Sequence, residues 1–200
     1  TIGQAAYFAG SSYTKNSDLL QEIDYVLKNL SSAVHQTAYF SVLSGGEVLY
    51  LLEERVPTPI TIQAKRGYKY PAYATGMGKA LLSGKTESDI KELYPEGLHK
   101  LTEHTIDEFD TLFGQMEEIR RTGYSFEKEE SNKDVQCIAV PVKYKEHVIA
   151  GMSVAVPVFY YSEEFEKKAM EELKKAKRHI EKLIQDNTQE WVYSPLGAEM

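Results

Sequence analysis

Hydrophobic positions along this 200-residue chain recur at two periods, which predict both helices and strands. From Asp18 to Leu30, leucine, isoleucine and valine recur every three or four residues, which predicts an amphipathic helix. The same spacing from Ser162 to about Ile184 predicts a last helix whose other face carries Lys and Glu. We interpret that charged face as a solvated helix surface in preference to a nucleic-acid-binding arm.

Alternating aromatic and β-branched residues predict a set of short strands. The first two are joined by Ser44-Gly-Gly46, a sequence typical of a hairpin turn, so we expect an antiparallel sheet rather than a doubly wound parallel one. The last two are apolar on both faces and should lie inside the sheet. The predicted strands are 36–43, 47–52, 60–64, 124–126, 135–142 and 148–156.

Two capping-box-like sequences predict further helices. Thr86 to Asp89 predicts a helix over 86–94, and Thr105 to Glu108 predicts a longer one that ends before Gly123. The polar residues 127–134 that follow are expected to form a loop.

One run of small residues, Tyr73-Ala-Thr-Gly-Met-Gly-Lys-Ala-Leu-Leu-Ser-Gly84, leads directly into a helical pattern. Gly76 and Gly78 would let the backbone approach a ligand, and the unpaired N–H groups of a starting helix attract a small anion. A turn that only lets a helix pack against a sheet explains the same residues. The run therefore predicts either an anion site or a packing turn.

Composition narrows the class of protein. Hydrophobic residues make up 42% and charged residues 26%, as in ordinary globular proteins, and the length suits one domain or at most two small ones. The net charge of −7 argues against direct binding of nucleic acid by this piece. A single cysteine and no apolar run of ~20 residues favour a cytoplasmic protein without a membrane partner. Because the chain begins with Thr1 rather than Met, we expect a fragment.

Enzyme and metal signatures are weak. Tyr73 stands where a phosphate-binding loop needs its first glycine, and Leu81 stands at the last glycine of a dinucleotide-binding motif. His99 and His104 lack the framing of a metal site, so neither a metal nor a cofactor is expected.

Cys137 and the acidic residues 127–130 each allow two interpretations. Cys137 lies in an apolar strand, where a free cysteine is more often a small buried hydrophobe than a nucleophile. The acidic residues suit a solvated loop, although one carboxylate there could hold a polar pocket or bond a ligand hydroxyl.

Five spaced motifs then occur in a familiar order. They are Tyr73-Ala-Thr-Gly-Met-Gly-Lys-Ala-Leu-Leu82, Leu101-Thr-Glu-His-Thr-Ile-Asp107, Ile119-Arg-Arg-Thr-Gly-Tyr-Ser-Phe-Glu-Lys-Glu-Glu130, Cys137-Ile-Ala-Val-Pro-Val142 and Ala150-Gly-Met-Ser-Val-Ala-Val-Pro157. Together they resemble the effector-binding domain of IclR-type bacterial transcriptional regulators.

This resemblance implies an α/β (α+β) fold of the GAF/PAS-like type, with an antiparallel sheet of about six strands flanked by helices. It implies a linker over 1–17 from a missing DNA-binding winged helix-turn-helix, an effector-binding domain over 18–184 and a C-terminal tail over 185–200. It also implies a homodimer or tetramer that binds a small organic acid and catalyses no reaction. DNA would be bound only through the missing module.

The resemblance also assigns an effector pocket to particular residues. The amides of Gly76 and Met77 would hold the effector carboxylate, with Met77 bulkier than the family's usual alanine. Glu127 replaces a shorter aspartate, and Ala155 replaces the second of two serines. The implied pocket residues are Gly76, Met77, Glu127, Cys137, Ser153, Ala155, Tyr70 and Ile62.

Two other functions stay open at this point. A GAF-like enzyme would use Cys137 as nucleophile, although a thiol reductase of that kind also needs a resolving cysteine, and the chain has none. A ligand-free dimerisation scaffold would have its pocket filled by Tyr70 and Met77.

Overall fold

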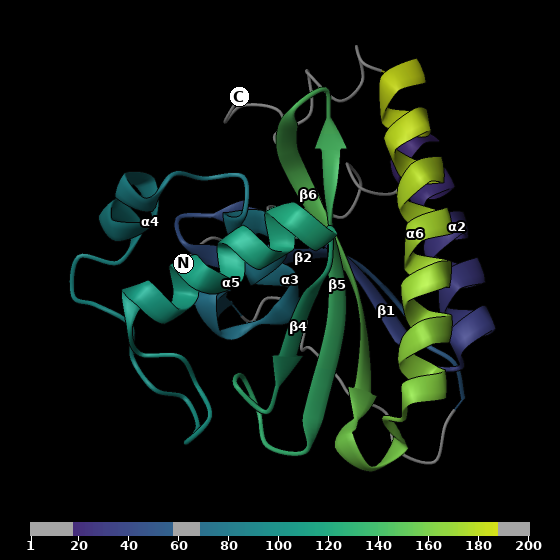
Figure 1. Cartoon of the computed structure of the whole chain (residues 1–200). Coiled ribbons are helices and arrows are strands. Elements are labelled where there is room, and N and C mark those ends of the chain that lie inside the picture. Colours follow the sequence, from purple (N-terminus) through teal and green to yellow (C-terminus); the bar gives the residue numbers. More distant parts are fainter. Residues whose placement is uncertain (1–17, 58–68, 188–200) are drawn as a thin grey trace, which may run out of the picture.

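The computed structural model describes residues 18–57 and 69–187 (Figure 1). Within them, six antiparallel strands form one sheet in the order β3-β2-β1-β6-β5-β4. The strands are β1 (Thr37–Ser44), β2 (Glu47–Glu54), β3 (Tyr70–Pro71), β4 (Ser125–Lys128), β5 (Val135–Tyr144) and β6 (His147–Pro157). The mixed α/β fold with an antiparallel sheet is therefore confirmed.

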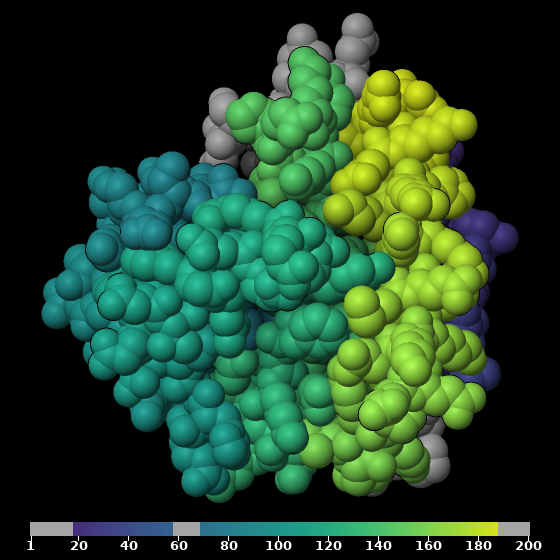
Figure 2. All heavy atoms as spheres, viewed as in Figure 1, coloured from purple at the N-terminus to yellow at the C-terminus, as the bar shows by residue number. Residues whose placement is uncertain are grey.

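Helices cover both faces of this sheet (Figure 1). One face carries α2 and α6, which pack side by side, and the other carries α3 and α5, with α4 beyond them. The helices are α2 (Asp18–Val34), α3 (Gly76–Leu82), α4 (Glu87–Leu93), α5 (Phe109–Thr122) and α6 (Glu163–Asp186), with 3-10 turns η1 (Ala72–Ala74) and η2 (Val158–Tyr160). In the space-filling view, green atoms of the β5 and β6 region are visible above and below α5, beside α6 (Figure 2).

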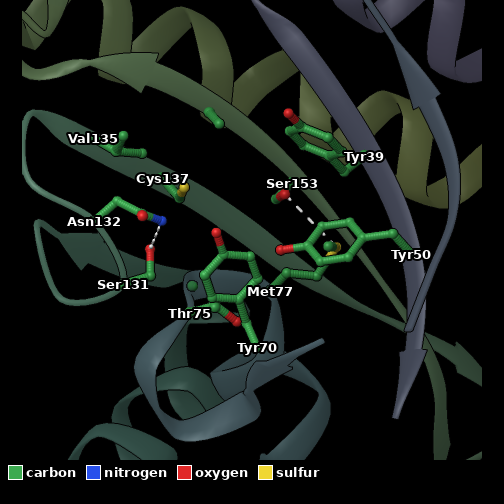
Figure 3. Close-up of a pocket in the computed structure, with 12 residues that line it drawn as sticks. Tyr39, Tyr50, Tyr70, Thr75, Met77, Ser131, Asn132, Val135, Cys137 and Ser153 are labelled. Atoms are coloured by element: carbon green, nitrogen blue, oxygen red, sulfur yellow. Dashed lines mark hydrogen bonds between the residues drawn. The ribbon is translucent and has the colours of Figure 1, made fainter. Parts of the chain in front are cut away.

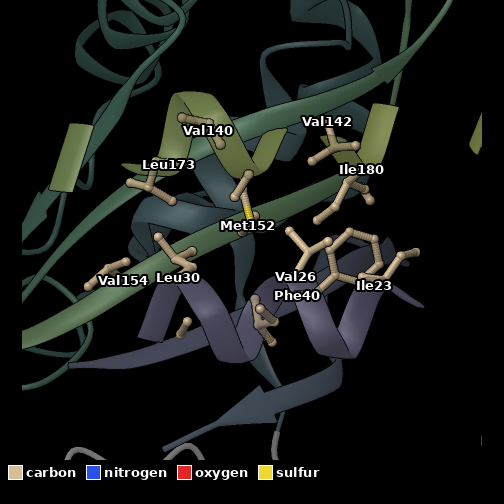
Figure 4. Packing of buried hydrophobic residues seen from close by; sticks show 14 of the residues in the cluster. Ile23, Val26, Leu30, Phe40, Val140, Val142, Met152, Val154, Leu173 and Ile180 are labelled. Carbon is tan, nitrogen blue, oxygen red and sulfur yellow. The ribbon is translucent and has the colours of Figure 1, made fainter. Parts of the chain in front are cut away.

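The two faces of the sheet have separate hydrophobic cores. Met152 and Val154 of β6 belong to the core under α2 and α6, together with Phe40 of β1 (Figure 4). Ala155, one position along β6, belongs to the other core, under α3 and α5. Successive side chains of a strand point to opposite faces, so a strand buried on both sides is apolar throughout. The predicted interior position of β5 and β6 is thus confirmed.

Local signals located several element boundaries correctly. Thr86 and Asp89 form the predicted capping box at the start of α4. Gly123, with φ of 80°, ends α5 and donates its N–H to the Ile119 carbonyl over 2.8 Å. Gly45 and Gly46 both have positive φ in the β1–β2 turn, which glycine adopts without strain.

Other boundaries differ from the prediction. The helix expected from Thr105 begins at Phe109, because the Thr105 hydroxyl is engaged elsewhere: it donates to the Glu130 carbonyl over 2.6 Å. The strand expected to end at Phe126 continues as β4 to Lys128, because residues 125–128 pair with β5. Strand β3, which pairs with β2, was not predicted.

Some expectations lie outside the described residues. They concern the third strand at 60–64, the linker over 1–17 and the tail beyond 187. Among the described residues, no helix is both long and apolar enough to span a membrane.

Candidate functional site

A cavity lies between the first turn of α3 and the sheet face opposite α2 and α6 (Figure 3). Its volume is about 50 Å³, room for a few water-sized groups. Five strands, the start of α3 and the loop after β4 contribute to its wall. The lining residues are Tyr39, Tyr50, Tyr70, Thr75, Gly76, Met77, Ser131, Asn132, Val135, Cys137, Ser153 and Ala155.

Six of the eight pocket residues assigned by resemblance line this cavity. They are Gly76, Met77, Cys137, Ser153, Ala155 and Tyr70. Glu127 lies just behind the wall, and Ile62 lies outside the described residues. The fold therefore brings these six residues from four separate segments, β3, α3, β5 and β6, to one place, which the chain order alone does not require.

The first turn of α3 presents backbone N–H groups at the cavity. Thr75 is the N-cap: its hydroxyl accepts from the Gly78 N–H over 2.9 Å, and its carbonyl accepts from the Lys79 N–H over 2.9 Å. The amides of Gly76 and Met77 come before these, and a helix offers no internal acceptor to its first N–H groups. The residues that carry these first N–H groups of α3 thus line the cavity.

The two glycines of this turn serve packing. A Cβ added to Gly78 would stand 2.2 Å from the Ala72 carbonyl oxygen, so glycine is needed for α3 to fold back on η1. A Cβ on Gly76 would stand 3.2 Å from the Cβ of Cys137. Gly78 does not line the cavity, so the structure gives it a packing role, and its expected approach to a ligand stays a prediction.

Three tyrosines of adjacent strands form the wall opposite α3. Tyr39 and Tyr50 meet edge to face with ring centroids 5.4 Å apart, and Tyr70 stands beside them (Figure 3). Burial, and then the nearby Cys137, Tyr39 and Tyr70, raise the pKa of Tyr50. Its phenol therefore stays neutral and can both donate and accept a hydrogen bond.

Sequence analysis did not identify Tyr39 and Tyr50. The period of two in β1 was the available signal, since Tyr39 lies directly opposite Ser153 in the β1–β6 register. That pairing puts Tyr39 on the pocket face, but the register between strands far apart in the chain cannot be predicted from one sequence.

Ser153 and Met77 contact each other across the cavity. The Ser153 hydroxyl donates to the Met77 sulfur over 3.6 Å (Figure 3). Both side chains are almost fully buried, at 3% and 2% exposure. A thioether is a weak acceptor, so a better acceptor on a ligand can replace it without loss.

Glu127 holds the neighbouring loop in place. Its Oε1 accepts from the backbone N–H groups of Glu130 and Ser131, over 2.7 and 3.0 Å, and from the Ser131 hydroxyl. Ser131 and the adjacent Asn132 line the cavity in its place. The carboxyl group thus shapes the wall from behind.

Lys79 and Glu130 form a buried ion pair that sequence analysis did not foresee. The Lys79 ammonium lies 2.6 Å from Glu130 Oε1, and the lysine side chain has no exposed surface. The Glu130 carbonyl accepts from the Thr105 hydroxyl as well. This network joins α3, the loop after β4 and the segment before α5. No local sequence motif predicts it.

Burial disfavours the charged forms of the thiol and of the two buried acids at the site, although Lys79 favours the ionised form of Glu130. Burial, with the neighbouring Glu127 adding to it, raises the pKa of Cys137 well above its ordinary value. Burial is also the largest cause that raises the pKa of Glu127 and of Glu130. A nucleophilic cysteine needs its thiolate, so this environment opposes that role.

Residues 18–57 and 69–187 contain no candidate metal site. No group of three or more His, Cys, Asp or Glu is placed there to hold a metal ion. His104 lies 4.0 Å from both Glu103 and Glu129, half exposed, as a surface histidine.

A family model described as "Bacterial transcriptional regulator IclR C-terminal" matches residues 11–182. The HTH-type transcriptional regulator KdgR of Dickeya chrysanthemi is 28% identical over 173 residues, which are 86% of this chain and 57% of that protein. The chain thus spans about three fifths of the curated relatives that it matches.

Two solved structures share the fold. The C-terminal domain of the Escherichia coli regulator KdgR superposes with a TM-score of 0.72 at 28% identity, covering 84% of this chain and 98% of that one. The inducer-binding domain of a double mutant of PobR from Acinetobacter, in complex with 3-hydroxybenzoic acid, gives a TM-score of 0.74 at 23% identity, covering 80% and 96%.

Proposed function

Because this chain belongs to the IclR family of bacterial transcriptional regulators, we propose that it senses a small organic acid and passes the signal to a DNA-binding domain. The observation that carries the proposal is the cavity at the start of α3, which is lined by Gly76 and Met77 of its first turn and by the hydroxyl-bearing residues Tyr39, Tyr50, Tyr70, Thr75, Ser131 and Ser153. Helix N-termini attract anions through their first backbone amides and through the helix dipole.

In the proposed complex, the ligand carboxylate accepts from the amides of Gly76 and Met77. Ser153 turns its hydroxyl from the Met77 sulfur to the ligand, and Cys137 and Tyr50 contact the remaining polar atoms. The small volume of the cavity favours a ligand of few atoms. A PobR domain of the same fold binds 3-hydroxybenzoic acid, which supports a carboxylate ligand for this fold.

The remaining parts of the proposal concern the whole protein. We infer that it works in the cytoplasm as a homodimer or tetramer, with DNA bound by a domain outside this chain. Ligand binding can alter DNA binding only as far as the ligand prefers one arrangement of the protein over another, and such couplings are typically ~1–3 kcal/mol.

The test is a thermal-shift and calorimetry screen of this chain against formate, glycolate, pyruvate and 3-hydroxybenzoate. A ligand that binds only the folded protein raises its melting temperature in proportion to its occupancy. We expect at least one acid to raise it and its uncharged amide analogue to have no effect. Equal effects of an acid and its amide would overturn the carboxylate contact.

A ligand-free scaffold is the second candidate, favoured by the small cavity and by Tyr70 and Met77 in its wall. It predicts that no acid in the screen binds. The enzyme hypothesis has less support, because the homologues are transcriptional regulators and the environment of Cys137 opposes a thiolate.

A further inference from the structure

Three charged side chains lie buried behind the cavity wall: Lys79, Glu127 and Glu130. Lys79 pairs with Glu130 at 2.6 Å, so these two charges balance each other. Glu127, only 1% exposed, forms no ion pair within the described part of the chain. An ionised Glu127 is thus a buried negative charge without a cation of its own, which is costly in a medium of low polarity.

Glu127 also lies directly behind the proposed ligand position. A Cβ on Gly76 would stand 3.3 Å from the Glu127 Cβ and 3.2 Å from that of Cys137. Gly76 and Cys137 line the cavity, and the Glu127 carboxyl group is near enough to the Cys137 thiol to raise its pKa, so an anion beside these two residues lies close to that carboxyl group. Two negative charges so close together away from water repel strongly.

The hydrogen bonds of Glu127 leave a place for a proton. Its Oε1 accepts from Glu130 N–H, Ser131 N–H and the Ser131 hydroxyl, whereas Oε2 is buried and has no hydrogen-bond partner among the described residues. In the acid form, Oε1 is the carbonyl oxygen and keeps all three bonds while Oε2 carries the proton. Protonation therefore keeps these three hydrogen bonds.

The other titratable groups that face Glu127 do not take up this proton in its place. They are Cys137 of β5, Lys79 of α3, Glu130 of the loop and Tyr50 of β2. Burial raises the pKa of Cys137 and of Tyr50, so both stay neutral, and Lys79 holds Glu130 in its ion pair. Burial, with Glu130 adding to it, also raises the pKa of Glu127 above its ordinary value.

We propose that the cavity takes up its anionic ligand together with one proton, carried by Glu127 on Oε2. This proposal rests on the proposed function, an acid ligand beside Gly76. Affinity for the acid then rises as the pH falls, by up to about tenfold per pH unit above the pKa of Glu127 in the free protein. The domain responds to acid concentration and to pH jointly.

Calorimetry at several values between about pH 5.5 and 8.5 tests the coupling. Glycolate, pyruvate and 3-hydroxybenzoate serve as probes because all three stay ionised in this range. Titrations in buffers of different ionisation enthalpy measure proton uptake. We expect the wild type and the exposed control Glu164→Gln to bind more tightly as the pH falls, with up to about one proton taken up per ligand. Glu127→Gln, a neutral isostere, should bind with a pH-independent affinity near the wild type's value at low pH.

Contrary results separate the two hypotheses. If Glu127→Gln keeps the pH dependence, or if the wild type shows none, the proton coupling is wrong while acid binding stands. If none of the three acids binds at any pH, the acid ligand fails and the coupling fails with it.

Carbon-13 NMR of labelled glutamate carboxyls gives a second readout that needs no ligand. The Glu127 resonance, assigned in the wild type by through-bond connection to its backbone, should titrate at a higher pH than exposed glutamates. A Glu127 resonance that titrates with the exposed glutamates would overturn the proposal even if Glu127→Gln failed to fold.

Discussion

The ammonium group of Lys79 lies 2.6 Å from the carboxylate of Glu130, a residue 51 positions later in the chain, and solvent barely reaches either side chain. Lys79 belongs to the helix whose first turn faces the cavity, and Glu130 precedes the two loop residues that line it. One ion pair therefore fixes two walls of the pocket relative to each other.

Lys79→Met should lower the free energy of unfolding by about 3–5 kcal/mol, because it leaves the buried Glu130 carboxylate unpaired. The double variant Lys79→Met with Glu130→Met should recover much of this loss, since no buried charge is left without a partner. Urea unfolding measures both values. A double variant less stable than Lys79→Met would contradict this account.

Gly78→Ala should destabilise the fold by about 3 kcal/mol or more, because its Cβ would stand 2.2 Å from the Ala72 carbonyl oxygen. Gly114→Ala in α5 is the matched control: nothing lies within 4 Å of its added Cβ. Gly114→Ala should stabilise the fold by about 1 kcal/mol, because alanine favours a helix more than glycine does. Melting temperatures that move the same way in both variants would contradict the packing role of Gly78.

Ser153→Leu should weaken acid binding at least about tenfold while the domain stays folded, because leucine fills the cavity beside Met77. Ser153→Ala, which removes only the hydroxyl, should have a smaller effect, of about 1 kcal/mol. Calorimetry and circular dichroism together separate loss of binding from loss of fold. If Ser153→Leu bound the acid as tightly as the wild type does, the proposed contact between Ser153 and the ligand would be wrong.

Glu127→Gln should change how stability depends on pH. In the wild type, the pKa of Glu127 is raised by folding, so the folded state binds a proton more tightly than the unfolded state. The stability from this proton is fully present below the unfolded pKa, about 4.3, and is lost as the pH rises through the folded pKa. Denaturant midpoints across this range should fall with pH more in the wild type than in Glu127→Gln. If the denaturant midpoints of the wild type and of Glu127→Gln changed with pH in the same way, the raised pKa of Glu127 would be refuted.

Cys137 should react slowly with iodoacetamide at neutral pH, because burial and Glu127 raise the pKa of its thiol. It is the single cysteine of the chain, so mass spectrometry reports it directly. Unfolding in urea should make the reaction fast and serves as the control. Rapid alkylation of the folded protein below neutral pH would restore the enzyme hypothesis.

The sequence by itself determined the fold class and most of its elements. Hydrophobic periods identified α2 and α6, the glycines after Ser44 identified the β1–β2 turn, and Thr86 identified the start of α4, because each of these signals depends on residues close together in the chain. Boundaries failed where a distant partner decided them, as with Thr105, whose hydroxyl bonds to Glu130 instead of starting a helix.

Only the tertiary structure decided how the site is built. The register of β1 and β6 places Tyr39 opposite Ser153. Glu127 lies behind the cavity wall, where its carboxyl group orients Ser131. The pairing of Lys79 with Glu130 likewise depends on the fold. Such contacts join residues far apart in the chain, and one sequence carries no local signal for them. Residue types thus indicated a polar pocket, whereas the folded geometry determined which groups face a ligand and which carry buried charge.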